Sequence, residues 1–280
     1  MLQSAVAASV LALVAPLAVA YQANAADAAA VDRYAALGDS YAAGIQIPDD
    51  KDPGDCYRSD HNYATLVTGS LHIPALDDIT CGGATTAEMT RAQGTNPPQL
   101  SVLTAGTDLV TLQIGGNDIG FGDILKTCIT ASLSNPFGSP CRDKYTAGGT
   151  DQLLQRIQAT APKIAAAVQA IRERSPQAEV LLLGYPAILP DTGYGCWPKV
   201  PIAYNDVPYL RSTQKALNSM IARQAGANGA AYVDVYKPSI GHDACQSSSK
   251  RWVEGLSTPM FHPNAAGHAA MAAVVKTAAG

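Results

Sequence analysis

The chain lacks the charge pattern of a protein that binds nucleic acids. Its 280 residues include 19 Lys and Arg against 23 Asp and Glu, for a net charge of −4 at pH 7, and the basic residues form no cluster. Proteins that bind nucleic acids or anionic membranes present a basic patch to the phosphates. We therefore expect no partner of either kind.

Two other signals are missing. No Cys-x-x-Cys pair of the kind that binds zinc occurs, and no Asn-x-Ser/Thr sequon occurs, so we expect no N-glycosylation. The cysteines are even in number and widely spaced, which favours three disulfides in an exported chain, although spacing leaves their connectivity open. They are Cys56, Cys81, Cys128, Cys141, Cys196 and Cys245.

A long apolar run occurs only at the start of the chain. Residues 1–25 are mostly apolar or small, and Ala-Val-Ala at 18–20 and Ala-Asn-Ala at 23–25 are candidate cleavage sites. No Lys or Arg precedes the run, which is unusual for a leader. A run of about 17 residues is at the short limit for a membrane anchor, so we interpret it as a secretory signal peptide. We expect a secreted, extracellular protein without a stable membrane anchor.

The remainder, residues 26–280, contains no repeat, linker or low-complexity tract and is expected to form one domain. Short apolar runs predict strands at 33–37, 75–80, 108–114, 178–183 and 230–235. Amphipathic spacing predicts helices at 151–174, at 209–225 and from Pro263 through Val275. Strands that alternate with helices indicate an α/β fold with a mostly parallel sheet covered on both faces.

Polar, glycine-rich motifs fall where these strands end. They are Gly38-Asp39-Ser40, Cys81-Gly82-Gly83, Gly115-Gly116-Asn117-Asp118 and, just before the last helix, His262-Pro263-Asn264. Ligands of parallel sheets bind beyond the carboxyl ends of the strands. We therefore expect the functional site at this edge.

The motifs hold the groups that acyl transfer by serine requires. Ser40, on a strand-to-helix turn, is the candidate nucleophile, although short Gly/Asp/Ser clusters are most often plain turns. The backbone N–H groups of Ser40 and Gly83 and the side-chain amide of Asn117 are candidate donors to an oxyanion.

A histidine is the expected base, because imidazole titrates near neutral pH. His262 stands in a rigid setting before a proline, whereas His268, inside the last helix, is expected to be a packing or surface residue. The other three lie in polar loops without a partner motif: His61, His72 and His242. Position alone leaves His262 evenly balanced between a base and a solvated loop residue.

The four motifs, in this order, resemble the four blocks of the SGNH hydrolases, also called the GDSL esterase/lipase family. The resemblance covers roughly residues 33 to 275 and implies that Ser40 is the nucleophile and His262 the general base. It also implies an oxyanion hole of Ser40, Gly83 and Asn117. Position 42 is Ala42, so the Gly-x-Ser-x-Gly elbow of α/β-hydrolases is absent.

The resemblance further implies the fold and the disulfides. The fold would be a three-layer α/β/α sandwich, flavodoxin-like, with a five-stranded parallel sheet. In a similar secreted microbial subgroup neighbouring cysteines pair, which implies Cys56–Cys81, Cys128–Cys141 and Cys196–Cys245.

The chain departs from the family pattern beside the histidine. Many members carry an aspartate three residues before it, where this chain has Pro259. We expect a Ser40–His262 dyad in which a main-chain carbonyl orients the imidazole, from Pro259 first or else from Met260. Asp234, Asp243 and Glu254 are more remote candidates for that role.

These observations predict a secreted serine esterase or lipase that acts as a monomer on lipid or small acyl esters, with no metal and no organic cofactor. A carbohydrate acetylesterase is the alternative within the same chemistry, and a non-enzymatic binding protein on this scaffold is a third. The stretch 185–208, with Tyr194, Trp197 and Tyr204, could wall the acyl or sugar site or could simply be loop packing.

Overall fold

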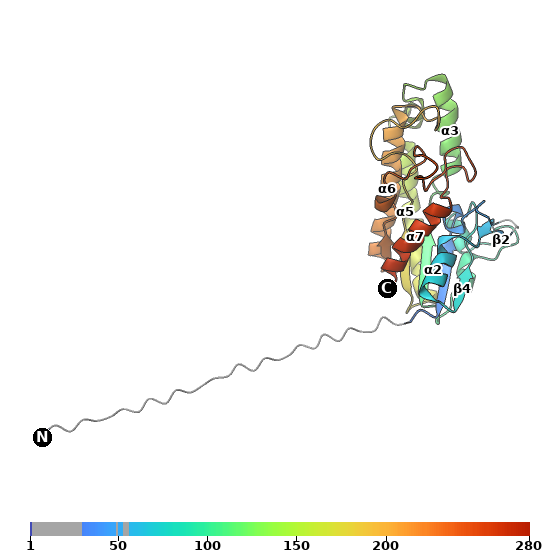
Figure 1. Ribbon diagram of the computed structural model, residues 1–280, viewed down its shortest axis with the longest axis vertical. Helices are drawn as coiled ribbons and strands as arrows, with labels where there is room; N and C mark the ends of the chain where they lie inside the picture. The colour runs from blue at the N-terminus through green and yellow to red at the C-terminus, as the bar shows by residue number, and fades with distance from the viewer. Residues whose placement is uncertain (2–29, 49, 53–55) are drawn as a thin grey trace. The chain divides into compact units, whose positions relative to one another are not determined.

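The computed structural model describes Met1 and residues 30–48, 50–52 and 56–280. Residues 2–25 of the expected signal peptide lie outside the described residues. Residues 31–280 form one compact unit (Figure 1).

A five-stranded sheet lies at the centre of this unit, in the order β4-β1-β5-β6-β7. All four strand pairings are parallel. The strands are β1 (Arg33–Gly38), β4 (Ala75–Asp78), β5 (Leu109–Gln113), β6 (Glu179–Leu183) and β7 (Ala231–Val233). Each predicted strand is present, and the predicted ends are correct to within two residues. The α/β fold with a five-stranded parallel sheet is therefore confirmed.

Successive strand residues pack on opposite faces of the sheet. Ala35 and Leu37 of β1 belong to one apolar cluster, and Tyr34 and Ala36 belong to the other. The first cluster includes residues of α5 (Gln152–Arg174) and α6 (Asp206–Ala227), and the second includes residues of α2 (Tyr63–Leu71) and α7 (Ala265–Ala278). Because side chains alternate along a strand, a sheet with apolar residues on both faces needs a helical layer on each face.

The structure also contains elements that the sequence patterns did not predict. Three helices had no predicted counterpart, namely α2, α3 (Phe121–Ser134) and α4 (Pro140–Thr146), whereas α1 (Ser40–Ala43) begins at the strand-to-helix turn expected at Ser40. The short 3₁₀ helices are η1 (Thr86–Met89), η2 (Gln99–Val102) and η3 (Lys237–Ser239), and a two-stranded hairpin joins β2 (Asp50–Asp52) to β3 (Arg58–Ser59). Most of these elements are too short for a clear periodicity, whereas α3, with 14 residues, carries apolar residues at helical spacing and was overlooked.

The predicted start of the last helix was wrong by two residues. The helix begins at Ala265, and the side-chain oxygen of Asn264 accepts a hydrogen bond from the backbone N–H of Gly267 at 3.0 Å. Asparagine is a favoured N-cap, and this cap places Pro263 before the helix rather than at its first position.

All six cysteines are paired, as the resemblance implied. The bridges are Cys56–Cys81, Cys128–Cys141 and Cys196–Cys245. The second bridge joins α3 to α4. In the described part of the chain, no helix is both long and apolar enough to cross a membrane.

Candidate active site

A tight turn at the end of β1 presents Ser40. Asp39 caps α1, because its Oδ1 accepts from the backbone N–H of Tyr41 at 2.9 Å. Gly38 has a φ of +147°, and a Cβ there would lie 2.5 Å from the carbonyl oxygen of Gln113. Only glycine fits this close approach. The side-chain amide of Gln99 bonds to both the N–H and the carbonyl of Gly38, at 2.8 and 2.9 Å, and fixes the end of the strand.

The structure brings Ser40 and His262 together although 222 positions separate them in the sequence. Ser40 Oγ lies 2.7 Å from His262 Nε2, and His262 Nδ1 lies 2.8 Å from the carbonyl oxygen of Met260. A carbonyl oxygen can only accept, so Nδ1 carries the proton and Nε2 is free to accept the serine proton. This is the arrangement that a nucleophile and its general base require.

The carbonyl that orients the ring belongs to Met260, so the choice of Pro259 was wrong. The Pro259 carbonyl accepts the backbone N–H of His262 at 3.0 Å instead. That bond closes a turn in which Phe261 has a φ of +56°. The turn occupies the Pro259 oxygen and leaves the next carbonyl directed at the ring.

The three remote carboxylates are engaged elsewhere. Glu254 accepts from Ser257 Oγ at 2.6 Å. Asp243 accepts from the backbone N–H of Cys245, and Asp234 accepts from that of Tyr236. None of the hydrogen bonds among the described residues joins these carboxylates to His262.

His262 lies among aromatic rings. The centroid of its ring is 4.7 Å from that of Tyr41 and 5.9 Å from that of Phe121. Burial lowers the pKa of His262 because the charged form loses hydration, and the bond to the Met260 carbonyl partly opposes this shift. The imidazole is therefore neutral at pH 7, as a base must be.

The three candidate oxyanion donors, Ser40, Gly83 and Asn117, come from the turn after β1 and from the loops after β4 and β5. Asn117 follows β5, and its Nδ2 donates to the carbonyl of Ala84 at 2.9 Å, which leaves the second amide hydrogen free for a ligand. This bond ties Asn117 to the loop that carries Gly83. Ser40 and Asn117 line one pocket, whereas Gly83 is outside its lining.

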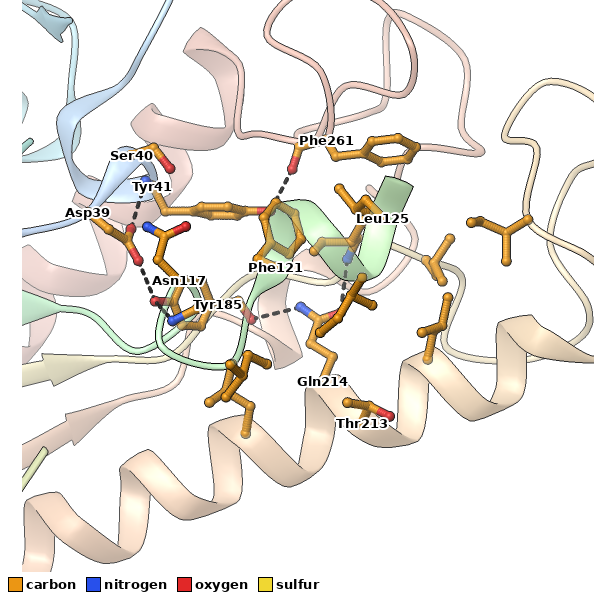
Figure 2. A pocket seen from close by; sticks show the side chains of 18 residues that line it. Asp39, Ser40, Tyr41, Asn117, Phe121, Leu125, Tyr185, Thr213, Gln214 and Phe261 are labelled. Carbon is orange, nitrogen blue, oxygen red and sulfur yellow. Dashed lines mark hydrogen bonds between the residues drawn. The ribbon is translucent and has the colours of Figure 1, made fainter. Parts of the chain in front are cut away.

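The pocket is an apolar cavity of about 780 Å³, including its open mouth. It extends from Ser40 and Asn117 along α6, as Figure 2 shows. Its apolar walls come from the loop before α3, α3 itself, the loop after β6, and α6. These segments contribute Ile119, Phe121, Ile124, Leu125, Ile188, Leu189, Ile202, Leu210 and Leu217, and Phe261, just before His262, also lines the pocket.

The stretch after β6 does wall this pocket, but through different residues from those expected. Tyr185, Ile188, Leu189 and Ile202 line it, whereas the three aromatic residues that the sequence suggested do not. Tyr204 stacks on Phe137 instead, with centroids 5.4 Å apart.

Sequence reasoning missed the walls that α3 and α6 supply. The α3 wall had a detectable signal, because Phe121, Ile124, Leu125 and Cys128 recur at helical spacing directly after the Gly-Gly-Asn-Asp motif. The tyrosine at 185 carried no such signal.

The remaining histidines have other environments. His268 is fully buried, its Nδ1 accepts from the backbone N–H of Tyr63 at 3.1 Å, and burial lowers its pKa to about 3. It is a packing residue. His242 stacks on Trp252, and His61 pairs with Asp60. Among the described residues, no group of three or more His, Cys, Asp or Glu could hold a metal ion.

Comparisons with known proteins agree with this geometry. The sequence profile of the GDSL-like lipase/acylhydrolase family matches residues 36–270. Lipase 2 of Streptomyces coelicolor is 44% identical over 248 residues, which cover 85% of this chain and 83% of the relative. Lipase 1 of the same organism is 32% identical over 265 residues, which cover 92% of this chain and 90% of the relative.

Solved structures show the same relationship. A phospholipase A1 from Streptomyces albidoflavus superimposes with a TM-score of 0.75 at 27% identity, covering 89% of this chain and 99% of that one. An extracellular lipase from Streptomyces rimosus superimposes with a TM-score of 0.74 at 30% identity, covering 88% and 99%. The family profile matches a span that contains both Ser40 and His262. The chain therefore belongs to the GDSL-like lipase/acylhydrolase family.

Proposed function

We propose that this enzyme, a carboxylic-ester hydrolase, cleaves esters of aliphatic acids with a dyad of Ser40 and His262. The observation that carries the proposal is the 2.7 Å contact between Ser40 Oγ and His262 Nε2 at one end of an apolar pocket. A nucleophile next to its base, and next to space for an alkyl chain, meets the requirements of acyl transfer from such esters.

The proposed reaction has two steps. Ser40 Oγ attacks the ester carbonyl carbon while His262 Nε2 takes the serine proton, and the oxyanion faces the N–H groups of Ser40 and Gly83 and the Asn117 amide. His262 then protonates the leaving alcohol as the C–O bond breaks. In the second step His262 takes a proton from water, the resulting hydroxide attacks the acyl-enzyme, and Ser40 leaves with the proton.

Met260 holds the ring for both steps. Its carbonyl oxygen keeps the proton on Nδ1, so Nε2 always faces Ser40. A carbonyl carries only a partial charge and stabilises the imidazolium less than a carboxylate would.

The pocket favours an acyl chain over an acetyl group. Leu210 and Leu217 of α6 both line it, and seven residues of helix at ~1.5 Å each make this wall about 10 Å long. An alkyl chain would cover that apolar wall, whereas an acetyl group would leave it in contact with water. The proposed substrates are therefore lipid-like esters rather than acetylated carbohydrates. The relatives named lipase and phospholipase A1 are consistent with this choice.

Export is the second part of the proposal. Three disulfides suit an oxidising compartment, the first 25 residues have the composition of a leader, and the structural relative from Streptomyces rimosus is an extracellular lipase. Ser40, His262 and the pocket form a complete site within a single chain, so the reaction does not require a second copy, and a monomer without a stable membrane anchor is part of the proposal.

The test is hydrolysis of p-nitrophenyl esters from acetate to palmitate by the mature protein and its Ser40→Ala variant. Ser70→Ala is the matched control, because Ser70 is an exposed serine of α2. We expect Ser40→Ala to lose about 10³-fold or more in kcat and the control to lose nothing. Equal rates for wild type and Ser40→Ala would overturn the dyad, and an optimum at acetate would favour the acetylesterase.

A further inference from the structure

The hydroxyl group of Tyr185 joins two loops of the site. Tyr185 follows β6 and is 4% exposed. Its hydroxyl donates to Asp39 Oδ2 at 2.6 Å and accepts from the backbone N–H of Gly116 at 2.8 Å. The three residues follow β6, β1 and β5, which are adjacent in the sheet, and Figure 2 shows the hydrogen bond between Asp39 and Tyr185 beside Asn117.

At one end of this link, Asp39 holds the nucleophile turn. Its Oδ1 caps α1 through the Tyr41 N–H while its Oδ2 accepts from Tyr185. One carboxyl group therefore positions the helix that begins at Ser40 and is itself positioned by the tyrosine.

At the other end, Gly116 begins the loop that carries Asn117. Gly115 has a φ of +114°, and neither glycine has a side chain that could anchor the backbone. The hydrogen bond to Tyr185 supplies the anchor. A Cβ at Gly116 would lie 3.1 Å from Tyr185 Oη, so glycine permits this close approach.

Tyr185 is held by α6. The side-chain amide of Asn218 accepts from the Tyr185 N–H and donates to the Tyr185 carbonyl, both at 2.9 Å. The tyrosine ring also packs edge-on against Tyr41, with centroids 5.1 Å apart. The hydroxyl group therefore projects from a rigid support.

We propose that Tyr185 is a positioning residue that sets the spacing between Ser40 and the Asn117 amide, through its hydrogen bonds to Asp39 and Gly116. The inference rests on the proposed function, which assigns the Asn117 amide to the oxyanion hole. Donors placed where the oxyanion forms act mainly on the transition state, so an error in their spacing lowers kcat more than it changes KM.

The test compares Tyr185→Phe with Tyr34→Phe. Tyr34 is the matched control, because its buried hydroxyl also makes a hydrogen bond, to Thr111 at 2.8 Å, on the opposite face of the sheet. We expect Tyr185→Phe to lower kcat by about 10-fold to 100-fold with KM changed less than about twofold. Tyr34→Phe should keep the wild-type kcat.

A second readout separates positioning from general loosening of the fold. Butaneboronic acid forms a tetrahedral adduct with a catalytic serine and resembles the oxyanion intermediate. Its Ki should rise for Tyr185→Phe by the same factor as kcat/KM falls, while the Ki of a non-covalent alcohol in the pocket stays unchanged. Circular dichroism gives the folded fraction of each variant.

Asp39→Asn provides an independent variant if Tyr185→Phe is unfolded at the assay temperature. An asparagine keeps the Oδ1 that accepts from the Tyr41 N–H, but it places an amide N–H where the Tyr185 hydroxyl needs an acceptor. We therefore expect kcat to fall and the boronate Ki to rise, as for Tyr185→Phe. A folded Tyr185→Phe variant with the wild-type kcat and the wild-type boronate Ki would overturn the inference. If Tyr185→Phe is unfolded, the same result for Asp39→Asn would overturn it. Undiminished hydrolysis by Ser40→Ala would instead overturn the proposed function.

Discussion

The carbonyl oxygen of Met260 accepts the Nδ1 proton of His262 at 2.8 Å, in the place where a carboxylate stands in many serine hydrolases. The oxygen fixes the tautomer of the base without placing a full negative charge beside it. Burial of the ring then dominates its titration, because no carboxylate among its described hydrogen-bond partners compensates for lost hydration.

This relationship predicts the pH dependence of catalysis. Hydrolysis needs neutral His262, and burial lowers its pKa below the ordinary value of 6.5. The protonated, inactive form therefore accumulates only below that pH, and the acid limb of kcat/KM should have its midpoint under pH 6.5. A pH-rate profile with a short-chain ester measures it.

The buried carboxyl of Asp39 titrates nearby and needs its own control. Burial raises the pKa of Asp39 to about 7. The profile of Asp39→Asn should keep the same acid midpoint, although its kcat is lower. An acid limb that disappears in this variant would assign the limb to Asp39 and contradict the role given to His262.

The raised pKa of Asp39 also predicts that the free energy of unfolding changes with pH. Its pKa is about 7 in the folded protein against an ordinary 3.8, so the folded state binds the extra proton between these values. The free energy of unfolding that this group contributes is therefore fully present below pH 3.8 and is lost as pH rises through 7. The shift corresponds to at most about 4 kcal/mol.

Urea unfolding of wild type and Asp39→Asn at several pH values isolates this contribution, because all other groups cancel in the difference. The wild type should lose stability relative to the variant as pH rises from about 4 to about 8. A difference that is constant across this range would show that the carboxyl has an ordinary pKa.

Asn117→Ala should remove one oxyanion donor. Loss of such a donor costs about 10²-fold to 10³-fold in kcat in serine hydrolases, with little effect on KM. The measurement is steady-state hydrolysis of a medium-chain p-nitrophenyl ester. Asn228→Ala, at the end of α6, is the matched control and should be fully active. A kcat for Asn117→Ala within about twofold of wild type would exclude the amide from the oxyanion hole.

Leu210→Trp should shorten the preferred acyl chain. Leu210 lines the pocket and is 9% exposed, so a larger ring there fills space that the distal carbons of the chain would occupy. We expect kcat/KM for long-chain esters to fall at least about 10-fold while the acetate ester is unaffected. Leu154→Trp, at an exposed position on α5, controls for the substitution itself. An unchanged chain-length profile would place the acyl chain elsewhere.

Much of the site could be predicted from local sequence patterns. The motifs around Ser40, Asn117 and His262 contain the candidate nucleophile, oxyanion donor and base. Parallel strands bring the motifs that follow them to one edge of the sheet. The strands were recognised because they are short apolar runs, and the helices 151–174 and 209–225 because their apolar residues recur at helical spacing.

The sequence by itself thus predicted the α/β fold class. Through the family resemblance it also predicted the proposed dyad of Ser40 and His262 and the pairing of the cysteines. Tertiary structure decided the rest. Whether Pro259 or Met260 orients the base depends on which of the two carbonyl oxygens already accepts a hydrogen bond within the local turn. The hydrogen bonds of the Tyr185 hydroxyl to Asp39 and Gly116 form only because the ends of three strands lie side by side. The pocket is lined together by residues of α3, of α6 and of the loop after β6. These features depend on distances between residues far apart in the chain, which local patterns of polarity do not encode.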